Sequence, residues 1–182
     1  MIDSYPVDKN PPDLARTDNA YLDIETAFDG RITIIGILRD GRDLVQFVGK
    51  DATVEAVLEY LEGCSCLHSY NGHRFDLPVI KSRLGLDLRG RFNSRDLMLD
   101  CWRHGLYGGF KAVEKKLGIA RSTTGVDGMM AMQLWAKYTE SDDKESLDLL
   151  LQYNREDVEN LVVLREILDR GPLEIESRRF PR

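Results

Sequence analysis

The chain has 182 residues, of which 42% are hydrophobic, and a formal net charge of -6 at pH 7. This length supports one well-buried core and is too short for two independent domains, so we expect a single domain. The acidic balance argues against a protein that holds nucleic acid through an overall positive charge.

The domain is expected to occupy residues 20–170. Residues 1–19 contain three prolines among polar residues, a composition that predicts an extended lead-in because proline disfavours both helix and strand. Residues 171–182 are expected to form a short C-terminal tail with a basic end.

Three β-rich segments open the domain, and the turn dipeptides Asp29-Gly30 and Asp40-Gly41 separate them. These segments are residues 21–26, 32–38 and 43–48. Short turns between consecutive strands predict a meander of three antiparallel strands.

Helices and two further strands follow the meander. Apolar residues at spacings of three and four predict a helix over 51–62. Strands are then predicted over 64–70 and 92–99, and helices over 75–84, 110–117, 128–138 and 144–169. This order resembles an α/β RNase H-like fold, in which a five-stranded mixed sheet combines an antiparallel meander with two parallel strands and is flanked by helices.

The cysteine pattern favours a reducing compartment. Cys64, Cys66 and Cys101 are odd in number, and no secretory segment precedes them. A zinc site at Cys64, Cys66 and His68 is disfavoured against an ordinary core strand, because no second ligand pair follows. No stretch approaches the roughly 18 apolar residues of a membrane span. We therefore expect a soluble, cytoplasmic protein without a membrane partner.

Two acids alternate with apolar residues in the first predicted strand, Tyr21-Leu22-Asp23-Ile24-Glu25-Thr26. Alternation sends Asp23 and Glu25 to one face of the strand. If helices cover both faces of the sheet, both carboxylates are buried, which is costly without a compensating cation. A divalent metal with oxygen ligands removes that cost. The alternative for this pattern alone is a strand with an acidic, solvated face.

Two further acids fall in predicted helices. Asp76 lies in the first turn of its helix, where an acid is also a common helix cap. Tyr153 and Asp157 are four residues apart in the last helix and therefore neighbours on one face, which leucines extend inward. An inward Asp157 with no obvious basic neighbour on its own face needs an explanation.

These segments resemble the three motifs of the DEDD exonuclease superfamily. The matching positions are Asp23 and Glu25, Asn71 to Asp76, and Tyr153 to Asp157. The Tyr-x-x-x-Asp spacing is that of the DEDDy subgroup, whereas the DEDDh subgroup has a His where position 152 is Gln. The first two motifs are similar to the proofreading domain of family B DNA polymerases. The chain resembles most closely the stand-alone YprB-like branch of RNase H-like exonucleases, over about residues 20–168.

The resemblance implies a metal-dependent 3′–5′ exonuclease that releases nucleoside 5′-monophosphates. Two divalent cations, Mg²⁺ or Mn²⁺, would be bound by four carboxylates, with one of them bridging both ions. Asp23 is the expected bridge, Glu25 and Asp157 complete the first site, and Asp76 holds the second through water. The Tyr153 hydroxyl is expected to orient the attacking water.

The expected partner is a nucleic acid with a free 3′ end, with single-stranded DNA favoured and RNA as the alternative. Thr26, Phe28, Asn71 and Phe75 are the expected substrate contacts, although Phe28 fits a core position equally well. Residues 72–121 hold 11 Lys and Arg against 5 Asp and Glu, a local charge of +6 that suits a phosphate backbone. The candidates for backbone contact are Arg74, Arg91, Arg95, Arg103, Lys111 and Arg121.

Two other functions stay open on this fold. A catalytically silent nucleic-acid-binding or partner-docking module would bind a single strand without cleaving it. An endonuclease of resolvase type would cut circular strands or branched junctions, and the Tyr-x-x-x-Asp motif disfavours it.

Overall fold

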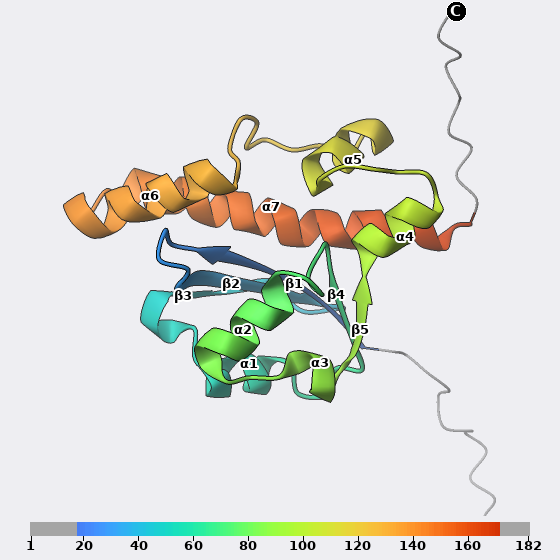
Figure 1. Cartoon of the computed structure of the whole chain (residues 1–182), viewed down its shortest axis with the longest axis horizontal. Helices are drawn as coiled ribbons and strands as arrows, with labels where there is room; N and C mark the ends of the chain where they lie inside the picture. Colours follow the sequence, from blue (N-terminus) through green and yellow to red (C-terminus); the bar gives the residue numbers. More distant parts are fainter. Residues whose placement is uncertain (1–17, 172–182) are drawn as a thin grey trace, which may run out of the picture.

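The computed structural model describes residues 18–171, which fold around a five-stranded sheet in the order β3-β2-β1-β4-β5 (Figure 1). The strands are β1 (Asn19–Thr26), β2 (Ile32–Arg39), β3 (Val45–Val48), β4 (Cys66–Ser69) and β5 (Asn93–Asp96). β1, β2 and β3 form an antiparallel meander, and β4 and β5 continue the sheet in parallel. The predicted architecture is therefore confirmed, and β1 is the central strand.

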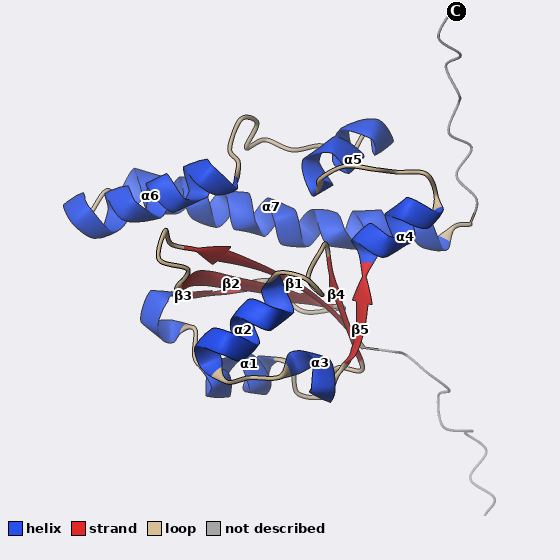
Figure 2. Cartoon of the chain, in the orientation of Figure 1, coloured by secondary structure: helices blue, strands red, loops and turns tan. Residues whose placement is uncertain are grey.

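Helices cover both faces of the sheet (Figure 2). On one face lie α1 (Val54–Tyr60), α2 (Asp76–Leu84) and α3 (Leu88–Arg91), with the short 3-10 helix η1 (Gly49–Asp51) before them in the chain. On the other lie α4 (Leu97–Arg103), α5 (Phe110–Leu117), α6 (Gly128–Ser141) and α7 (Lys144–Asp169).

The side chains of β1 alternate between the two helical layers. Leu22 and Ile24 belong to the buried cluster that includes residues of α1, α2 and α3. Tyr21 belongs to a second buried cluster with Val158 and Leu161 of α7. Because alternate residues of a strand share a face, the odd-numbered acids of β1 point toward α7.

The two hairpin turns were predicted correctly from their Asp-Gly dipeptides. Gly30 has a φ of 73° and Gly41 a φ of 71°, in the left-handed region that glycine enters without steric cost. These turns return the chain into register, so that Asp23 lies opposite Gly36 on β2.

The predicted fifth strand over 92–99 is too long, and neither α3 nor α4 was predicted. β5 ends at Asp96, whose side chain accepts a hydrogen bond from the Met98 amide at 3.1 Å and so caps α4. The run Leu97-Met98-Leu99 was assigned to the strand because a short apolar run fits a buried strand and a buried helix equally well.

The predicted lead-in and tail lie almost wholly outside the described residues. Within residues 1–19 only the last two are described, and Asn19 already belongs to β1. Residues 172–182 of the tail are not described. Among residues 18–171, no helix has both the length and the apolar character needed to cross a membrane.

Candidate active site

Three carboxylates meet where α7 crosses β1. Asp23 and Glu25 come from the strand and Asp157 from the helix, and one carboxylate oxygen of each lies within 4.8 Å of those of the other two. Glu25 and Asp157 are buried, with exposed fractions of 7% and 6%, whereas Asp23 is partly exposed. Clustered carboxylate oxygens are the ligands that a hard divalent cation prefers.

The cluster carries more negative charge than its surroundings compensate. Burial raises the pKa of Asp23 well above its usual range, and the charges of Asp157, Glu25 and Asp76 raise it further. Burial and the charge of Asp157 also raise the pKa of Glu25. Buried like charges of this kind favour a positive ion among them, so the donor set fits a divalent metal.

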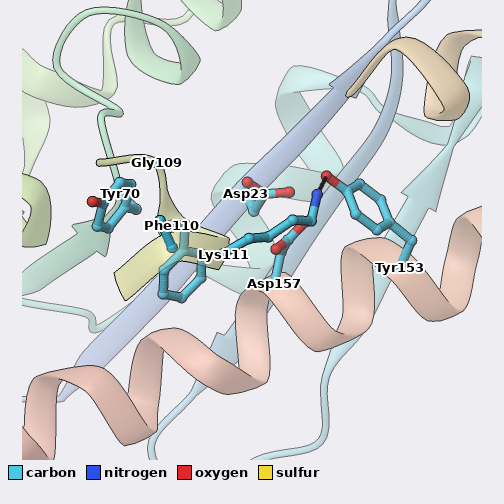
Figure 3. Close-up of a pocket in the computed structure, with 8 residues that line it drawn as sticks. Asp23, Tyr70, Gly109, Phe110, Lys111, Tyr153 and Asp157 are labelled. Carbon is cyan, nitrogen blue, oxygen red and sulfur yellow. Dashed lines mark hydrogen bonds between the residues drawn. The ribbon is translucent and has the colours of Figure 1, made fainter. Parts of the chain in front are cut away.

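An open pocket of about 460 Å³ leads to the acids (Figure 3). Asp23, Tyr153 and Asp157 line it together with Tyr70 and Phe110, whose rings are stacked with centroids 4.9 Å apart. The Tyr70 hydroxyl donates a hydrogen bond to the Gly108 carbonyl oxygen at 2.7 Å, which holds the stacked pair to the loop before α5. The pocket therefore combines carboxylates with an aromatic wall.

Lys111 reaches across the same pocket from α5 (Figure 3). Its Nζ donates a hydrogen bond to the Tyr153 hydroxyl oxygen at 2.5 Å and lies 4.2 Å from the centre of the Tyr153 ring. Burial and then the charges of Asp157 and Glu25 raise the pKa of Tyr153, so its hydroxyl stays protonated. Lys111 thus places a positive charge beside the acids. This position inside the pocket is more specific than the general contact with a nucleic-acid backbone that was expected for Lys111.

Asp157 has a basic partner that comes from a segment outside its own helix. Arg121, in the segment between α5 and α6, donates a hydrogen bond from Nη2 to Asp157 Oδ1. Arg121 also makes two hydrogen bonds to the buried Glu114, of 3.0 and 2.7 Å, and its side chain is only 7% exposed. Arg121 was one of the candidates for contact with a nucleic-acid backbone, but in this structure its side chain is buried and paired with acids.

Glu156 fastens the segment that carries Arg121 to α7. Its two carboxylate oxygens accept hydrogen bonds from the amides of Ser122 and Thr123, at 2.9 and 3.0 Å, and from both hydroxyl groups. Burial raises the pKa of Glu156, but these hydrogen bonds outweigh it and lower the pKa to about 2. Glu156 is therefore ionised, and it fixes the approach of Arg121 to Asp157.

Asn154 is a site residue that the sequence did not reveal. It is completely buried on α7, and its Nδ2 donates a hydrogen bond to Asp23 Oδ2 at 2.9 Å. Its Oδ1 accepts a hydrogen bond from Gln46 Nε2 at 2.9 Å. The only sequence signal was its position between Tyr153 and Asp157 on the inward stripe of the helix.

Asp76 lies outside the group of three but close to it. It is 3% exposed at the start of α2, and its Oδ1 accepts a hydrogen bond from the Ile24 amide at 3.1 Å. Burial raises the pKa of Asp76 to about 7. Its contact with the Ile24 amide places Asp76 beside β1, next to the strand residues that carry the acids, and its predicted role in a second metal site stays a prediction.

The predicted substrate contacts lie outside the lining of the described pocket. Thr26 is partly exposed at the end of β1, and Asn71 donates its amide to Asp96 Oδ1 at 2.8 Å. Phe28 and Phe75 are 62% and 44% exposed, which excludes the core position considered for Phe28. Among the described residues, Tyr70, Phe110 and Lys111 line the pocket instead.

The cysteines do not join a metal-binding group within residues 18–171. All three are free, and the acid trio is the one set of three such ligands close enough to hold an ion there. His68 is buried against Tyr21, with ring centroids 5.1 Å apart.

The chain is similar to known proteins at the level of its family and its fold. A model of the RNase_H superfamily matches residues 20–169. Among solved structures, the chain is similar to the family B DNA polymerase from the hyperthermophilic archaeon Pyrobaculum calidifontis, with a TM-score of 0.68 and 14% sequence identity. That match covers 85% of this chain and 25% of the polymerase chain, and at this identity it shows the fold alone. No curated protein matches the chain.

Proposed function

The chain belongs to the RNase_H superfamily, and from that membership we propose that it is a metal-dependent 3′–5′ exonuclease acting on single-stranded nucleic acid. RNase H-like proteins are generally nucleases that use divalent metals. The single observation that carries the proposal is the trio of carboxylates within 4.8 Å of one another, two of which, Asp23 and Asp157, line an open pocket. The Tyr153 and Asp157 spacing favours the DEDDy type of exonuclease over other nucleases.

Asp23, Glu25 and Asp157 would bind the cations, and Asp76 would support a second ion through water. The fit rests on ligand chemistry, because ionised carboxylates only accept. Burial, followed by the charges of the neighbouring acids, raises the pKa of Asp23 and of Glu25, and a bound cation would offset both effects. Divalent cations, when bound, lower the pKa of a coordinated water and neutralise charge on the phosphate.

The remaining residues of the pocket would position the substrate. The protonated Tyr153 hydroxyl would orient the attacking water, and the Lys111 ammonium group would contact the terminal phosphate. The Tyr70–Phe110 pair would stack against the terminal bases, a contact that tolerates any sequence. The aromatic wall therefore favours unpaired bases over a closed duplex.

A cleavage assay with a 5′-labelled single strand tests the proposal. With Mg²⁺ or Mn²⁺ we expect a descending ladder, and with EDTA an intact strand. Asp23→Asn should abolish the ladder, whereas Asp148→Asn, on the exposed side of α7, should leave it unchanged. Tight binding of the strand without cleavage under every metal would instead favour the catalytically silent module.

Substitution of Tyr153 tests its proposed role separately. Tyr153→Phe removes the hydroxyl and keeps the ring that contacts Lys111. We expect slower cleavage with unchanged half-saturation by Mn²⁺, because the hydroxyl positions water and is not a metal ligand in this proposal. A rate equal to that of the wild type would exclude that role.

A further inference from the structure

We propose that Asn154 is a positioning residue that, together with Gln46, fixes the Asp23 carboxylate for cation binding. The inference rests on the proposed function, since it concerns the same acid cluster. It adds a specific claim, namely that the affinity of the site depends on a buried amide that touches neither cation nor substrate.

The hydrogen-bond partners of Gln46 and Asn154 allow only one orientation of each side-chain amide. The Leu151 carbonyl oxygen can only accept, so Gln46 must present its Nε2 group there, at 2.8 Å. The same Nε2 donates to Asn154 Oδ1 at 2.9 Å, which turns Asn154 Nδ2 toward Asp23. Each amide orientation is therefore dictated by the preceding partner, and the chain ends on Asp23 Oδ2.

Asn154 holds the strand as well as the carboxylate. Its Nδ2 also lies 3.3 Å from the Asp23 carbonyl oxygen, so one amide group contacts both the backbone and the side chain of Asp23. Among the described residues, Asp23 Oδ1 accepts no hydrogen bond, so this second oxygen is left for a ligand. Two contacts to one residue restrict the rotation of its side chain and leave one acceptor oxygen available.

A glycine makes room for this arrangement. Gly36 lies directly between Asp23 and Gln46 across the sheet, paired with Asp23 on β1 and with Gln46 on β3. A Cβ atom at Gly36 would come within 2.3 Å of Asn154 Oδ1 and 2.9 Å of Val158 Cγ2. Any side chain at Gly36 would therefore push α7 or Asn154 away from Asp23.

The contrast between Asn154 and Arg121 explains why a neutral partner suits Asp23. Arg121 brings a positive charge to Asp157, so a cation that binds there must share Asp157 with Arg121 or displace Arg121 from it. Asn154 donates a hydrogen bond without adding charge, so it orients the Asp23 carboxylate without bringing a competing cation to it. The structure thus distinguishes Asp23 as the acid prepared for metal binding.

The test is a titration of metal-free protein with Mn²⁺, followed by the electron paramagnetic resonance signal of the free ion. Asn154→Ala removes the contact to Asp23, and we expect affinity for Mn²⁺ to fall about 10- to 100-fold, as for other residues that orient metal ligands. Gln46→Leu, at a partly buried position on the edge strand, should cause a smaller loss in the same direction.

Controls separate this inference from the proposed function. If wild-type protein binds no Mn²⁺, the proposed function fails. If wild type binds and the folded Asn154→Ala variant binds equally well, the positioning role is excluded. If Asn154→Ala does not fold, Gln46→Leu decides, and wild-type affinity in that variant overturns the inference. Ser146→Ala weakens the first turn of α7 through its contact with Asp143 and should leave Mn²⁺ affinity unchanged.

In the active protein, the Mn²⁺ concentration for half-maximal cleavage should rise in Asn154→Ala while the KM for the strand stays constant. A purely structural role would instead lower the fraction of folded protein without changing the metal requirement of what remains folded.

Discussion

Removing one carboxylate from the cluster should stabilise the metal-free protein. Asp23→Asn keeps the size of the side chain and an oxygen that can accept the hydrogen bond from Asn154. At an effective dielectric constant of about 20, two unit charges 4.8 Å apart repel by about 3 kcal/mol. Arg121 offsets part of the Asp157 charge, so the repulsion between Asp23 and Glu25 alone gives a lower bound on the repulsion that Asp23 experiences. Partial protonation of the raised-pKa acids reduces it, and we expect a gain of about 2 kcal/mol.

Thermal unfolding in EDTA and in Mn²⁺ measures this effect. For a domain of this size, about 2 kcal/mol corresponds to a Tm increase of roughly 4–8 °C for Asp23→Asn in EDTA. Mn²⁺ should raise the Tm of the wild type and have little effect on the variant. Asp148→Asn removes an exposed acid from the same helix and should stay within about 0.5 kcal/mol of wild type. A variant that melts below wild type in EDTA would show that the cluster is not electrostatically strained.

Three further outcomes follow from the same contacts. In EDTA, stability against urea should fall as pH rises from about 4 to about 7, because burial raises the pKa of Asp76 from 3.8 to about 7 in the folded protein. In that pH range the folded protein keeps a proton on Asp76 that the unfolded chain has already released. Mg²⁺ should flatten this dependence. Arg121→Met leaves buried Glu114 and Asp157 without their cation and should lower the free energy of unfolding by about 3–5 kcal/mol, and an unchanged urea midpoint would contradict the ion pair. Gly36→Ala should lower it by about 1–3 kcal/mol and weaken Mn²⁺ binding, whereas Gly128→Ala, where a Cβ meets nothing within 4 Å, should do neither.

The elements that the sequence predicted well are those with local signals. Asp29-Gly30 and Asp40-Gly41 located the hairpins, and helical periodicity located α5 and α7 at their observed bounds. The start of α4 was missed because the run Leu97-Met98-Leu99 fits a strand as well as a helix. The position of Asp96, which caps α4, is also fixed by hydrogen bonds from the amides of Asn71 and His73. Contacts of that kind join distant segments and leave no local pattern.

The candidate site shows the same division. Strand alternation placed Asp23 and Glu25 on one face of their strand, and helical spacing turned Asp157 inward, because each pattern depends on a single element. That the three acids meet was implied only by the family resemblance, and the structure brings them within 4.8 Å of one another. The partners of these acids come from elsewhere in the chain: Asn154 is 131 residues from Asp23, and Arg121 is 36 residues from Asp157. A single sequence without tertiary contacts cannot distinguish such an arginine from a solvated one.

The most direct test of the proposed exonuclease is to label one single strand at either end and follow release with Mn²⁺. We expect a 3′-terminal label to appear at once as a nucleoside 5′-monophosphate, while a 5′ label passes through a descending ladder, and a circular strand stays intact. Early release of the 5′ label, or cutting of the circle, would contradict 3′–5′ exonuclease action at the Asp23, Glu25 and Asp157 cluster.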